Sequence, residues 1–480
     1  MNKTDMLHWT KTKIVATLGP ASCDRQVLSA MIDSGVDICR INSSHGSYEF
    51  HQTVIDIIRE LNHAKKTNIG ILVDLQGPKL RIGVMENGQA EIKAGSKMTI
   101  TTQECVGTAE KVYITYPQFP KDVAIGDKIL IDDGKLMLEV KATNQNDEVE
   151  AVVIAGGTLS SKKGVNLPNT RISLPSLTPK DLQDLEFALR NNVEWIGLSF
   201  VRSVTDVVDL KERIKAAKKT SRVIAKIEKP EAIKEIDNII DLADAVMVAR
   251  GDLGVELPME EVPLLQKMIV KKCLTASKPV IIATQMMESM ITNYTPTRAE
   301  VNDVANAVMD GADAVMLSGE TSVGKYPVQV IQAMNKIIQA VESKNEAIYY
   351  KEQPPSLRNQ TFISDSICFN ACNMARYSGA RGIVSMTNSG YTAFKLSSHR
   401  PKANIFIFTD NPSLLNTLNL VWGVRGFYYD RYESTDNTIH EVKEFLKREQ
   451  LVKENDLLIH IASIPMKERG RANMIKLGQV

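Results

Sequence analysis

The chain of 480 residues is too long for one ordinary hydrophobic core, and its length predicts about three domains. A hydrophobic content of 43% and a charged content of 24% are typical of a soluble globular protein. The net charge of +1 and the lack of a long Lys/Arg block argue against nucleic acid or a membrane surface as a partner.

The six cysteines are scattered and form no CxxC pair or zinc-like spacing. Cys368 and Cys372 stand one helical turn apart, and we expect them to be buried structural thiols. The N-terminal segment MNKTDMLHWTKTK lacks the apolar core of a signal peptide, and no run is long and uncharged enough to span a bilayer. We therefore expect a reduced, cytoplasmic protein.

The N-terminal part of the chain alternates between strand and helix. Strands are expected from Lys13 to Gly19, from Ile38 to Asn42 and in NIGILVDLQ, which contains Asp74. Amphipathic segments over Gln26–Asp33 and Glu49–His63 separate them. This alternation is the pattern of parallel α/β folds.

From Lys79 to about Arg171 the pattern changes to short alternating runs. The Asn87-Gly88 and Asp133-Gly134 steps between strand-like flanks are typical of hairpin turns, and no convincing helix interrupts the runs. We predict an all-β domain, arranged as a small barrel, that is inserted into the α/β domain.

Strand–helix alternation resumes after this insertion. Thr178 is a predicted helix N-cap followed by Pro179, and Thr297 with Glu300 forms a capping box. Strands are predicted in WIGLSF, RVIAKIE, AVMVAR, PVIIAT and AVMLSGE. Together with the three early strands they make eight, the number that closes a (β/α)8 TIM barrel. An open doubly wound sheet is the alternative.

The polar, proline-containing stretch KEQPPSLRNQ, which begins at Lys351, is a predicted linker to a separate α/β domain. Strands are expected there in RGIVSM, NIFIFTD and DLLIHIAS, and a helix in NTIHEVKEFLKREQ. The predicted domain limits are 1–78 with 172–350 for the barrel, 79–171 for the insertion and 351–480 for the C-terminal domain.

Chemistry is expected in the stretch from Arg222 to Glu256, which reads as two buried strands joined by a helix. Lys226 and Glu228 stand at the end of the first strand, and Asp252 follows the second. Functional groups gather at the carboxyl ends of parallel barrel strands. Glu228 and Asp252 are therefore candidate ligands of one hard divalent cation. For either carboxylate alone, a salt-bridged surface acid is the alternative interpretation.

Other predicted strand ends supply further polar residues, namely Arg40, Asn42, Ser44, His45, Asp74, Gln76, Lys79, Gly251 and Thr284. The planar guanidinium of Arg40 suits a phosphate or a carboxylate. Lys226 can act as an electrostatic clamp, a proton carrier or a Schiff-base nucleophile, and its neighbour Glu228 favours the clamp. GETSVGKY nearly fits a P-loop, but Tyr326 replaces the metal-binding hydroxyl, so we interpret it as a chance match.

The sequence resembles the pyruvate kinases over nearly its whole length. The resemblance is carried by TKIVATLGPAS, CRINSSHGS, VDLQGPKLRIG, SKKGVNLP, AKIEKPE, MVARGDLGVE, ATQMMESM, PTRAEVNDVANAV and DAVMLSGETSVGKYP. It implies a TIM barrel with a mobile β-domain lid, a C-terminal α/β domain and a homotetramer. It also implies phosphoryl transfer from phosphoenolpyruvate to ADP and protonation of the enolate to pyruvate, the last step of glycolysis.

Site roles follow from the resemblance position by position. Glu228 and Asp252 match the ligands of Mg²⁺, with Mn²⁺ as an alternative, while Lys226 and Arg40 match the residues that bind the transferring phosphoryl group. The remaining matches are Gly251, Asp252 and Thr284 at the substrate carboxylate, with Thr284 close to the face where the enolate is protonated, and Arg81, Lys163 and His45 along the nucleotide.

Two regions bear on regulation and ion dependence. Asn42, Ser44 and Asp74 match the monovalent-cation region, but Leu75, Gln76 and Lys79 replace the Thr-Lys-Glu of potassium-dependent members. This resembles the potassium-independent subgroup, with the Lys79 ammonium in place of the ion, so we expect no K⁺ requirement.

The TNSGYTA loop suggests an effector site formed by Thr387, Asn388, Ser389 and Thr392, which would bind a phosphorylated sugar or nucleotide as an allosteric activator. A solvated turn is the alternative. The unusual C-terminal segment ASIPMKERGRANMIKLGQV puts a fructose-bisphosphate site in doubt, and no consequence follows from Ser43, where the family usually has Phe.

Two other functions use the same residues. A pyruvate-releasing barrel aldolase can stabilise an enolate with the same metal and lysine, but it needs neither Lys163 nor a lid. A non-catalytic metabolite sensor would keep the C-terminal site and lose the barrel residues, yet none of these is lost here.

Overall fold

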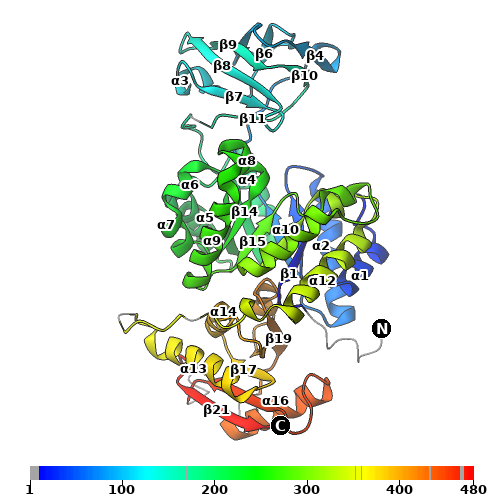
Figure 1. The fold of residues 1–480 in the computed structure, drawn as a ribbon, viewed down its shortest axis with the longest axis vertical. Coiled ribbons are helices and arrows are strands. Elements are labelled where there is room, and N and C mark those ends of the chain that lie inside the picture. The colour runs from blue at the N-terminus through cyan, green and yellow to red at the C-terminus, as the bar shows by residue number, and fades with distance from the viewer. Residues whose placement is uncertain (1–9, 169, 352, 358, 432–433, 465–469) are drawn as a thin grey trace.

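The computed structural model describes residues 10–168, 170–351, 353–357, 359–431, 434–464 and 470–480. Three bodies lie one above another along the long axis: the inserted β-domain at the top, the barrel in the middle and the C-terminal domain at the bottom (Figure 1). Residues 465–469 of the unusual C-terminal segment lie outside the described residues.

The middle body is a closed barrel of eight strands in the order β1-β16-β15-β14-β13-β12-β3-β2, and every neighbouring pair is parallel. This confirms the predicted (β/α)8 fold and excludes the open doubly wound sheet. The strands are β1 (Lys13–Thr17), β2 (Ile38–Asn42), β3 (Gly70–Asp74), β12 (Trp195–Leu198), β13 (Arg222–Ile227), β14 (Ala245–Ala249), β15 (Val280–Ala283) and β16 (Ala314–Leu317).

Helices cover the outside of this barrel. They are α1 (Arg25–Asp33), α2 (Tyr48–Lys65), α4 (Pro179–Arg190), α5 (Val204–Ala216), α6 (Pro230–Lys234), α7 (Ile236–Leu242), α8 (Arg250–Glu256), α9 (Val262–Ala276), α10 (Arg298–Asp310), α11 (Gly319–Ser322) and α12 (Pro327–Lys344), with 3-10 turns η3 (Met259–Glu261), η4 (Glu288–Ile291) and η5 (Glu346–Ile348). Both predicted N-caps are confirmed: Thr178 and Thr297 each form a capping box that satisfies first-turn amides.

The barrel interior is a packed core and not a channel. Trp195 is fully buried in it beside Ile224 and Met247, and Leu420 of the C-terminal domain belongs to the same cluster. The Trp195 indole Nε1 donates to the Thr417 carbonyl at 3.3 Å. The C-terminal domain therefore closes the lower end of the barrel, which leaves only the carboxyl ends of the strands for chemistry.

The inserted domain, called the lid below, leaves the barrel after β3 and returns before α4. Its elements are η2 (Glu86–Gly88), β4 (Gln89–Ile92), β5 (Lys97–Thr101), β6 (Lys111–Tyr113), α3 (Phe119–Asp122), β7 (Lys128–Ile131), β8 (Leu136–Thr143), β9 (Glu148–Ala155), β10 (Gly157–Ser160) and β11 (Val165–Asn166). These strands form a six-stranded sheet in the order β11-β7-β8-β9-β5-β6 and a two-stranded sheet in the order β10-β4. Isolated bridges from Arg81 to Gly164 and from Ile82 to Ile114 connect the segment that enters the lid to the chain beside β11 and beside β6, the two edge strands of the larger sheet. The one-turn helix α3 was not predicted from the sequence.

The C-terminal domain has one five-stranded sheet in the order β19-β18-β17-β20-β21. Its elements are α13 (Phe362–Ser378), β17 (Gly382–Met386), α14 (Tyr391–Ser398), β18 (Asn404–Thr409), α15 (Pro412–Leu418), β19 (Val424–Tyr428), α16 (Thr435–Arg448), β20 (Leu457–Ala462) and β21 (Met474–Gln479). The edge strands β19 and β21 were not predicted, because both are largely accessible and lack a continuous apolar run. No helix in the described part of the chain has the length and apolar character to cross a membrane.

Candidate active site

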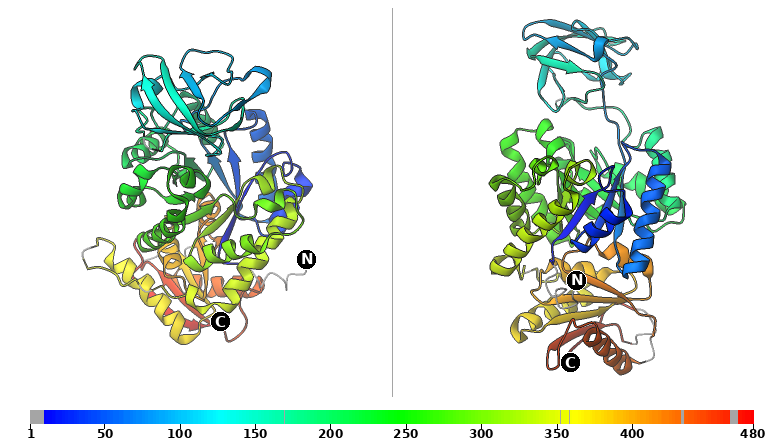
Figure 2. Two further views of the ribbon diagram at one scale, coloured as in Figure 1. Left: turned by 45° about the horizontal axis from the view of Figure 1, so that its top comes forward. Right: turned by 90° about the vertical axis from the view of Figure 1, so that its right-hand side faces the viewer.

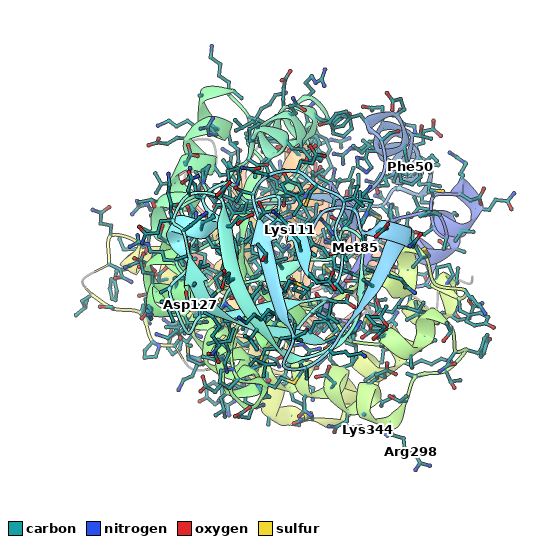
Figure 3. All side chains as sticks on the ribbon, turned by 90° about the horizontal axis from the view of Figure 1, so that it is seen from above. Phe50, Met85, Lys111, Asp127, Arg298 and Lys344 are labelled. Atoms are coloured by element: carbon teal, nitrogen blue, oxygen red, sulfur yellow. The ribbon has the colours of Figure 1, made fainter. Side chains whose placement is uncertain are left out.

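The lid lies above the carboxyl ends of the barrel strands. Seen from above, Lys111 and Met85 of the lid lie near the centre of the molecule, whereas Arg298 and Lys344 of the barrel helices lie at its edge (Figure 3). Two chain segments join the lid to the barrel (Figure 2). The candidate site is thus the region between the lid and the barrel mouth.

At the centre of this region, four charged side chains from three strands form one connected network. The Asp74 Oδ2 atom accepts from Arg40 Nε at 2.9 Å and Nη2 at 2.6 Å, and it lies 3.2 Å from Lys226 Nζ. Lys226 Nζ also contacts Glu228 Oε1 at 2.9 Å. All four residues are at least nine-tenths buried. The structure therefore brings together residues that the sequence separates by up to 188 positions, from Arg40 to Glu228.

Local sequence makes room for this network. Gly197 of β12 pairs with Asp74 in the barrel register, and a Cβ there would lie 2.6 Å from Asp74 Oδ1. Thr17 of β1 pairs with Arg40, and its hydroxyl accepts from Arg40 Nη1 at 2.9 Å while donating to the Leu317 carbonyl. A small residue and a hydroxyl on neighbouring strands thus hold the carboxylate and the guanidinium in place.

The charges shift one another's protonation. Burial alone raises the pKa of the Asp74 carboxyl, but Lys226 and Arg40 outweigh burial and lower the pKa below its usual value. Burial lowers the pKa of Lys226, yet Asp74 and Glu228 raise it above its usual value. The lysine is consequently held as an ammonium, which supports the electrostatic clamp and argues against a Schiff-base nucleophile.

Glu228 and Asp252 are the two candidate ligands of a divalent cation. Burial raises the pKa of Glu228, Lys226 opposes this rise, and the charge of Asp252 adds to it. The repulsion between two such carboxylates is relieved by a bound cation. Among the described residues no three His, Cys, Asp or Glu side chains gather into a metal site, so a cation here would take its other ligands from substrate and water.

Thr284 lies beside Gly251 at the ends of β15 and β14. Its backbone has a φ of 71°, a left-handed conformation that is strained for a β-branched residue. The Thr284 hydroxyl accepts from the Gly251 amide at 2.7 Å, and a Cβ on Gly251 would lie 3.3 Å from that hydroxyl. Arg250 Nη2 binds the Thr284 carbonyl at 2.8 Å while the same guanidinium pairs with Asp303. These contacts maintain the strained conformation.

The predicted nucleotide residues are not in contact with the network. Lys163 Nζ pairs with Asp132 Oδ1 within the lid at 2.9 Å, and Arg81 Nη1 donates to the Lys162 carbonyl at 2.9 Å. His45 is exposed on the loop after β2, and its carbonyl accepts from His51 Nε2. All three lie above or beside the barrel mouth, separate from the buried charges.

In the monovalent-cation region, the Asn42 Oδ1 atom accepts from the Ser44 amide at 3.1 Å. Asp74 Oδ1 is buried and has no hydrogen-bond partner. Lys79 is exposed where the chain enters the lid, and it lines a small cavity together with Asp252. Its side chain lies beside the lid residue Gly164, where an added Cβ would be 3.6 Å from Lys79 Cε.

The TNSGYTA loop joins β17 to α14, far from the barrel mouth. The Thr387 hydroxyl accepts from the Gly390 amide, and Thr392 is buried against Ser385 at 2.9 Å. Asn388 and Ser389 are exposed. Of the four predicted effector residues, these two are exposed, Thr387 is half-buried, and Thr392 supports the loop from inside.

Several residues of the site were missed by sequence reasoning. Ser199 Oγ accepts from Lys226 Nζ at 2.7 Å and donates to the Leu75 carbonyl, and Thr17 and Asp303 anchor the two arginines. Ser199 lies in the predicted strand WIGLSF and directly follows β12, so its place at a strand end was a usable signal. Asp303 lies within the helix α10, and no sequence signal marked it as a site residue.

Comparisons with known proteins agree with this geometry. The family model described as "Pyruvate kinase, barrel domain" matches residues 9–331, and "Pyruvate kinase, alpha/beta domain" matches residues 365–477. The pyruvate kinase of Geobacillus stearothermophilus is 42% identical over 471 residues, covering 97% of this chain and 80% of that protein. The pyruvate kinase of Mycobacterium tuberculosis (strain CDC 1551 / Oshkosh) is 41% identical over 468 residues, covering 98% of each.

Among solved structures, a pyruvate kinase from Cryptosporidium parvum superposes with a TM-score of 0.91 at 32% identity, covering 100% of this chain and 99% of that one. The similarity thus extends through the barrel, the lid and the C-terminal domain, and it includes every strand that contributes to the charged network. The chain belongs to the pyruvate kinase family of phosphotransferases.

Proposed function

We propose that this chain transfers the phosphoryl group of phosphoenolpyruvate to ADP and then protonates the enolate, giving pyruvate and ATP. The observation that carries the proposal is the buried network of Arg40, Asp74, Lys226 and Glu228. Phosphoryl transfer depends on alignment and charge neutralisation more than on covalent chemistry. This network supplies fixed charges in a buried site, where water screens them weakly.

Each cation of the network has a distinct task. Arg40 is oriented by Thr17 and Asp74, which leaves its planar guanidinium fixed for binding phosphate oxygens. Lys226 is held by Asp74, Glu228 and Ser199, so its ammonium is fixed where negative charge moves from the phosphoryl group to the enolate oxygen. Neither residue needs to reorganise during the reaction.

Glu228 and Asp252 would hold Mg²⁺, or Mn²⁺ in its place. Oxygen ligands and a small number of protein carboxylates are typical of Mg²⁺ sites that also bind substrate phosphates. The bound ion would supply charge neutralisation between the two anionic substrates. The Asp252 amide in the first turn of α8 suits the substrate carboxylate. The Gly251 amide, which donates to the Thr284 hydroxyl, would be shared with that carboxylate. We assign protonation of the enolate to the region of Thr284, whose hydroxyl accepts from the Gly251 amide at 2.7 Å.

The nucleotide would lie between the barrel mouth and the lid, along His45, Arg81 and Lys163. Lys163 is engaged by Asp132, so it must exchange this carboxylate for a nucleotide phosphate when ADP binds. An aldolase would not need this exchange. One coupled assay of pyruvate release from phosphoenolpyruvate separates the candidate functions: we expect release only with both ADP and Mg²⁺, whereas release without ADP would indicate a lyase or hydrolase, and no release would indicate a sensor.

We also propose that turnover needs no K⁺. Leu75 is buried and offers no side-chain oxygen, and Lys79 brings a positive charge to the cavity that Asp252 lines. The unpartnered Asp74 Oδ1 atom is an acceptor that an ammonium group can satisfy once the hinge moves.

Allosteric activation by a phosphorylated sugar or nucleotide is proposed at Thr387, Asn388, Ser389 and Thr392. Support comes from the left-handed turn at Gly390, with a φ of 85°, which immediately precedes α14, and from the exposure of Asn388 and Ser389. Arg222, the first residue of β13, donates to the Ser389 carbonyl at 3.2 Å and connects this loop to the strand that carries Lys226.

A cytoplasmic homotetramer is proposed as the assembly. Met259 and Leu264 near α9 are 77% and 70% exposed, and Ile363 and Tyr377 of α13 are 65% and 84% exposed. Apolar residues on the barrel and on the C-terminal domain suit the two different interfaces of a symmetric tetramer. The domain limits 1–78 with 172–350, 79–171 and 351–480 are likewise proposed, and limited proteolysis at the two lid connections tests them.

A further inference from the structure

A buried acid at the far end of α8 links this helix to the lid. The first turn of α8 carries Gly251 and Asp252, and its last residue is Glu256. Glu256 Oε1 accepts from Lys229 Nζ at 2.6 Å and from Asn166 Nδ2 at 2.8 Å. Lys229 directly follows Glu228 in the barrel, whereas Asn166 belongs to the lid strand β11. One carboxylate oxygen therefore joins the barrel, the helix and the lid.

The barrel side of this contact is buried and closely packed. Lys229 and Glu256 are each 5% exposed, and the Lys229 ammonium lies 5.8 Å from the centre of the Phe200 ring. The Phe200 amide in turn donates to Glu228 Oε2 at 2.8 Å. The second oxygen of Glu256, Oε2, is buried without a hydrogen-bond partner. Because both donors reach the same oxygen, loss of Asn166 would leave this buried carboxylate with Lys229 as its hydrogen-bond partner, which makes the lid's contact costly to break.

On the lid side, the same strand fixes the predicted nucleotide residue. Asn166 stands three positions after Lys163 and pairs with Leu130 of β7. The turn after β7 contains Asp132, the partner of Lys163, and a Cβ on Gly134 in that turn would lie 4.0 Å from Val255 of α8. The Lys163–Asp132 pair is therefore held near α8, whose first turn contains Gly251 and Asp252.

We propose that Asn166 and Glu256 form a latch that fixes the lid on α8 and thereby positions Lys163 over the nucleotide. Asn166, Glu256 and Lys229 are positioning residues in this scheme, because none of them needs to touch substrate. The proposal rests on the proposed function in one respect, the assignment of Lys163 to the nucleotide. A purely structural contact would stabilise the fold without changing affinity for ADP selectively.

The test measures ADP binding in the full-length protein. Asn166→Ala removes a hydrogen bond to a charged group, a contact worth roughly a factor of ten or more in an equilibrium constant. We expect the Kd for MgADP and the KM for ADP to rise roughly tenfold, with the KM for phosphoenolpyruvate and the Tm close to those of the wild type. N166D places a second carboxylate against Glu256 and should raise both ADP constants further.

The double variant N166D/E256Q is the decisive rescue. It exchanges the carboxylate and the amide, so Lys229 keeps an anionic partner and the lid keeps its hydrogen bond to α8. We expect it to recover most of the ADP affinity that N166D loses. Asn146→Ala, at an exposed lid turn, is the matched control and should behave as the wild type.

Two results would overturn the latch: an Asn166→Ala variant with ADP constants within twofold of the wild type, or no rescue in the double variant. Hydrogen exchange separates these outcomes from a failure of the proposed function. Even in a protein that forms no pyruvate, the latch requires faster exchange over residues 161–166 and 250–256 in Asn166→Ala than in Asn146→Ala. Equal exchange in the two variants would refute it.

Discussion

Replacing Glu228 with glutamine tests the central network with the smallest change in shape. The substitution removes one negative charge from the proposed metal site while Lys226 keeps Asp74 at 3.2 Å and Ser199 at 2.7 Å. Removal of one essential charge in phosphoryl transfer costs about 10³-fold or more in turnover, or about 4 kcal/mol of transition-state stabilisation. We therefore expect the kcat/KM of Glu228→Gln to fall at least about a thousandfold.

The fold should be affected much less. An amide has one acceptor oxygen where the carboxylate has two, so either the Phe200 amide at 2.8 Å or the Lys226 ammonium at 2.9 Å loses a partner. One such loss costs about 1–3 kcal/mol of unfolding free energy. The raised pKa of Glu228, caused first by burial, shows that its ionised form is itself costly in the fold, so the neutral amide recovers part of that loss.

The assay compares kcat/KM from coupled pyruvate release, Mn²⁺ affinity and thermal unfolding for the wild type, Glu228→Gln and Glu261→Gln. Glu261 is exposed and provides the same chemical change away from the site. We expect weakened Mn²⁺ binding and lost turnover only in Glu228→Gln. A folded Glu228→Gln enzyme within tenfold of wild-type kcat/KM would refute the assignment of Glu228 as a metal ligand.

Three further predictions concern other parts of the chain. Turnover in a K⁺-free Tris buffer should stay within about tenfold of that with K⁺, or ~1.4 kcal/mol, and a larger fall would contradict the substitution of the ion by Lys79. Ser389→Glu should abolish activation by phosphorylated sugars or nucleotides and spare basal turnover, and an undiminished response would remove the effector site. Burial, with Lys443 and Lys476, lowers the pKa of His460 to about 4. Between pH 6.5 and 4 the unfolded chain therefore binds more protons than the folded one, so the free energy of unfolding decreases as the pH is lowered through that window. At pH 5 this amounts to roughly 2 kcal/mol, and His460→Gln should show a shallower fall of Tm between pH 7 and 5; parallel curves would disprove this origin.

The fold class could be predicted because its signals are local. Each barrel strand is a short apolar run with charge at its carboxyl end, and helices such as α4 begin at a cap that is readable from Thr178 and Asp181. The lid was recognised from turn dipeptides, but its sheet arrangement was not. Closure of a barrel depends on long-range register, whereas a turn dipeptide specifies only the neighbouring strands.

Prediction of the site was uneven for the same reason. Lys226, Glu228 and Asp252 stand at predicted strand ends, and parallel strands in one barrel place such ends together. Asp74 was assigned to the monovalent-cation region, and in the structure it also orients Arg40 and Lys226. This depends on Gly197, 123 positions away in the sequence, making room for its carboxylate. No local pattern reports that contact.

The sequence by itself determined which residues carry charge at the ends of buried strands, and hence the barrel, the family and the candidate metal and phosphoryl-binding residues. Only the tertiary structure decided which charges meet: Asp74 with Arg40 and Lys226, Lys163 with Asp132, and Glu256 with both Lys229 and Asn166. The physical reason is that propensity and capping act over a few residues along the chain. The energies of buried charges instead depend on distances of a few ångströms between segments that are remote in sequence.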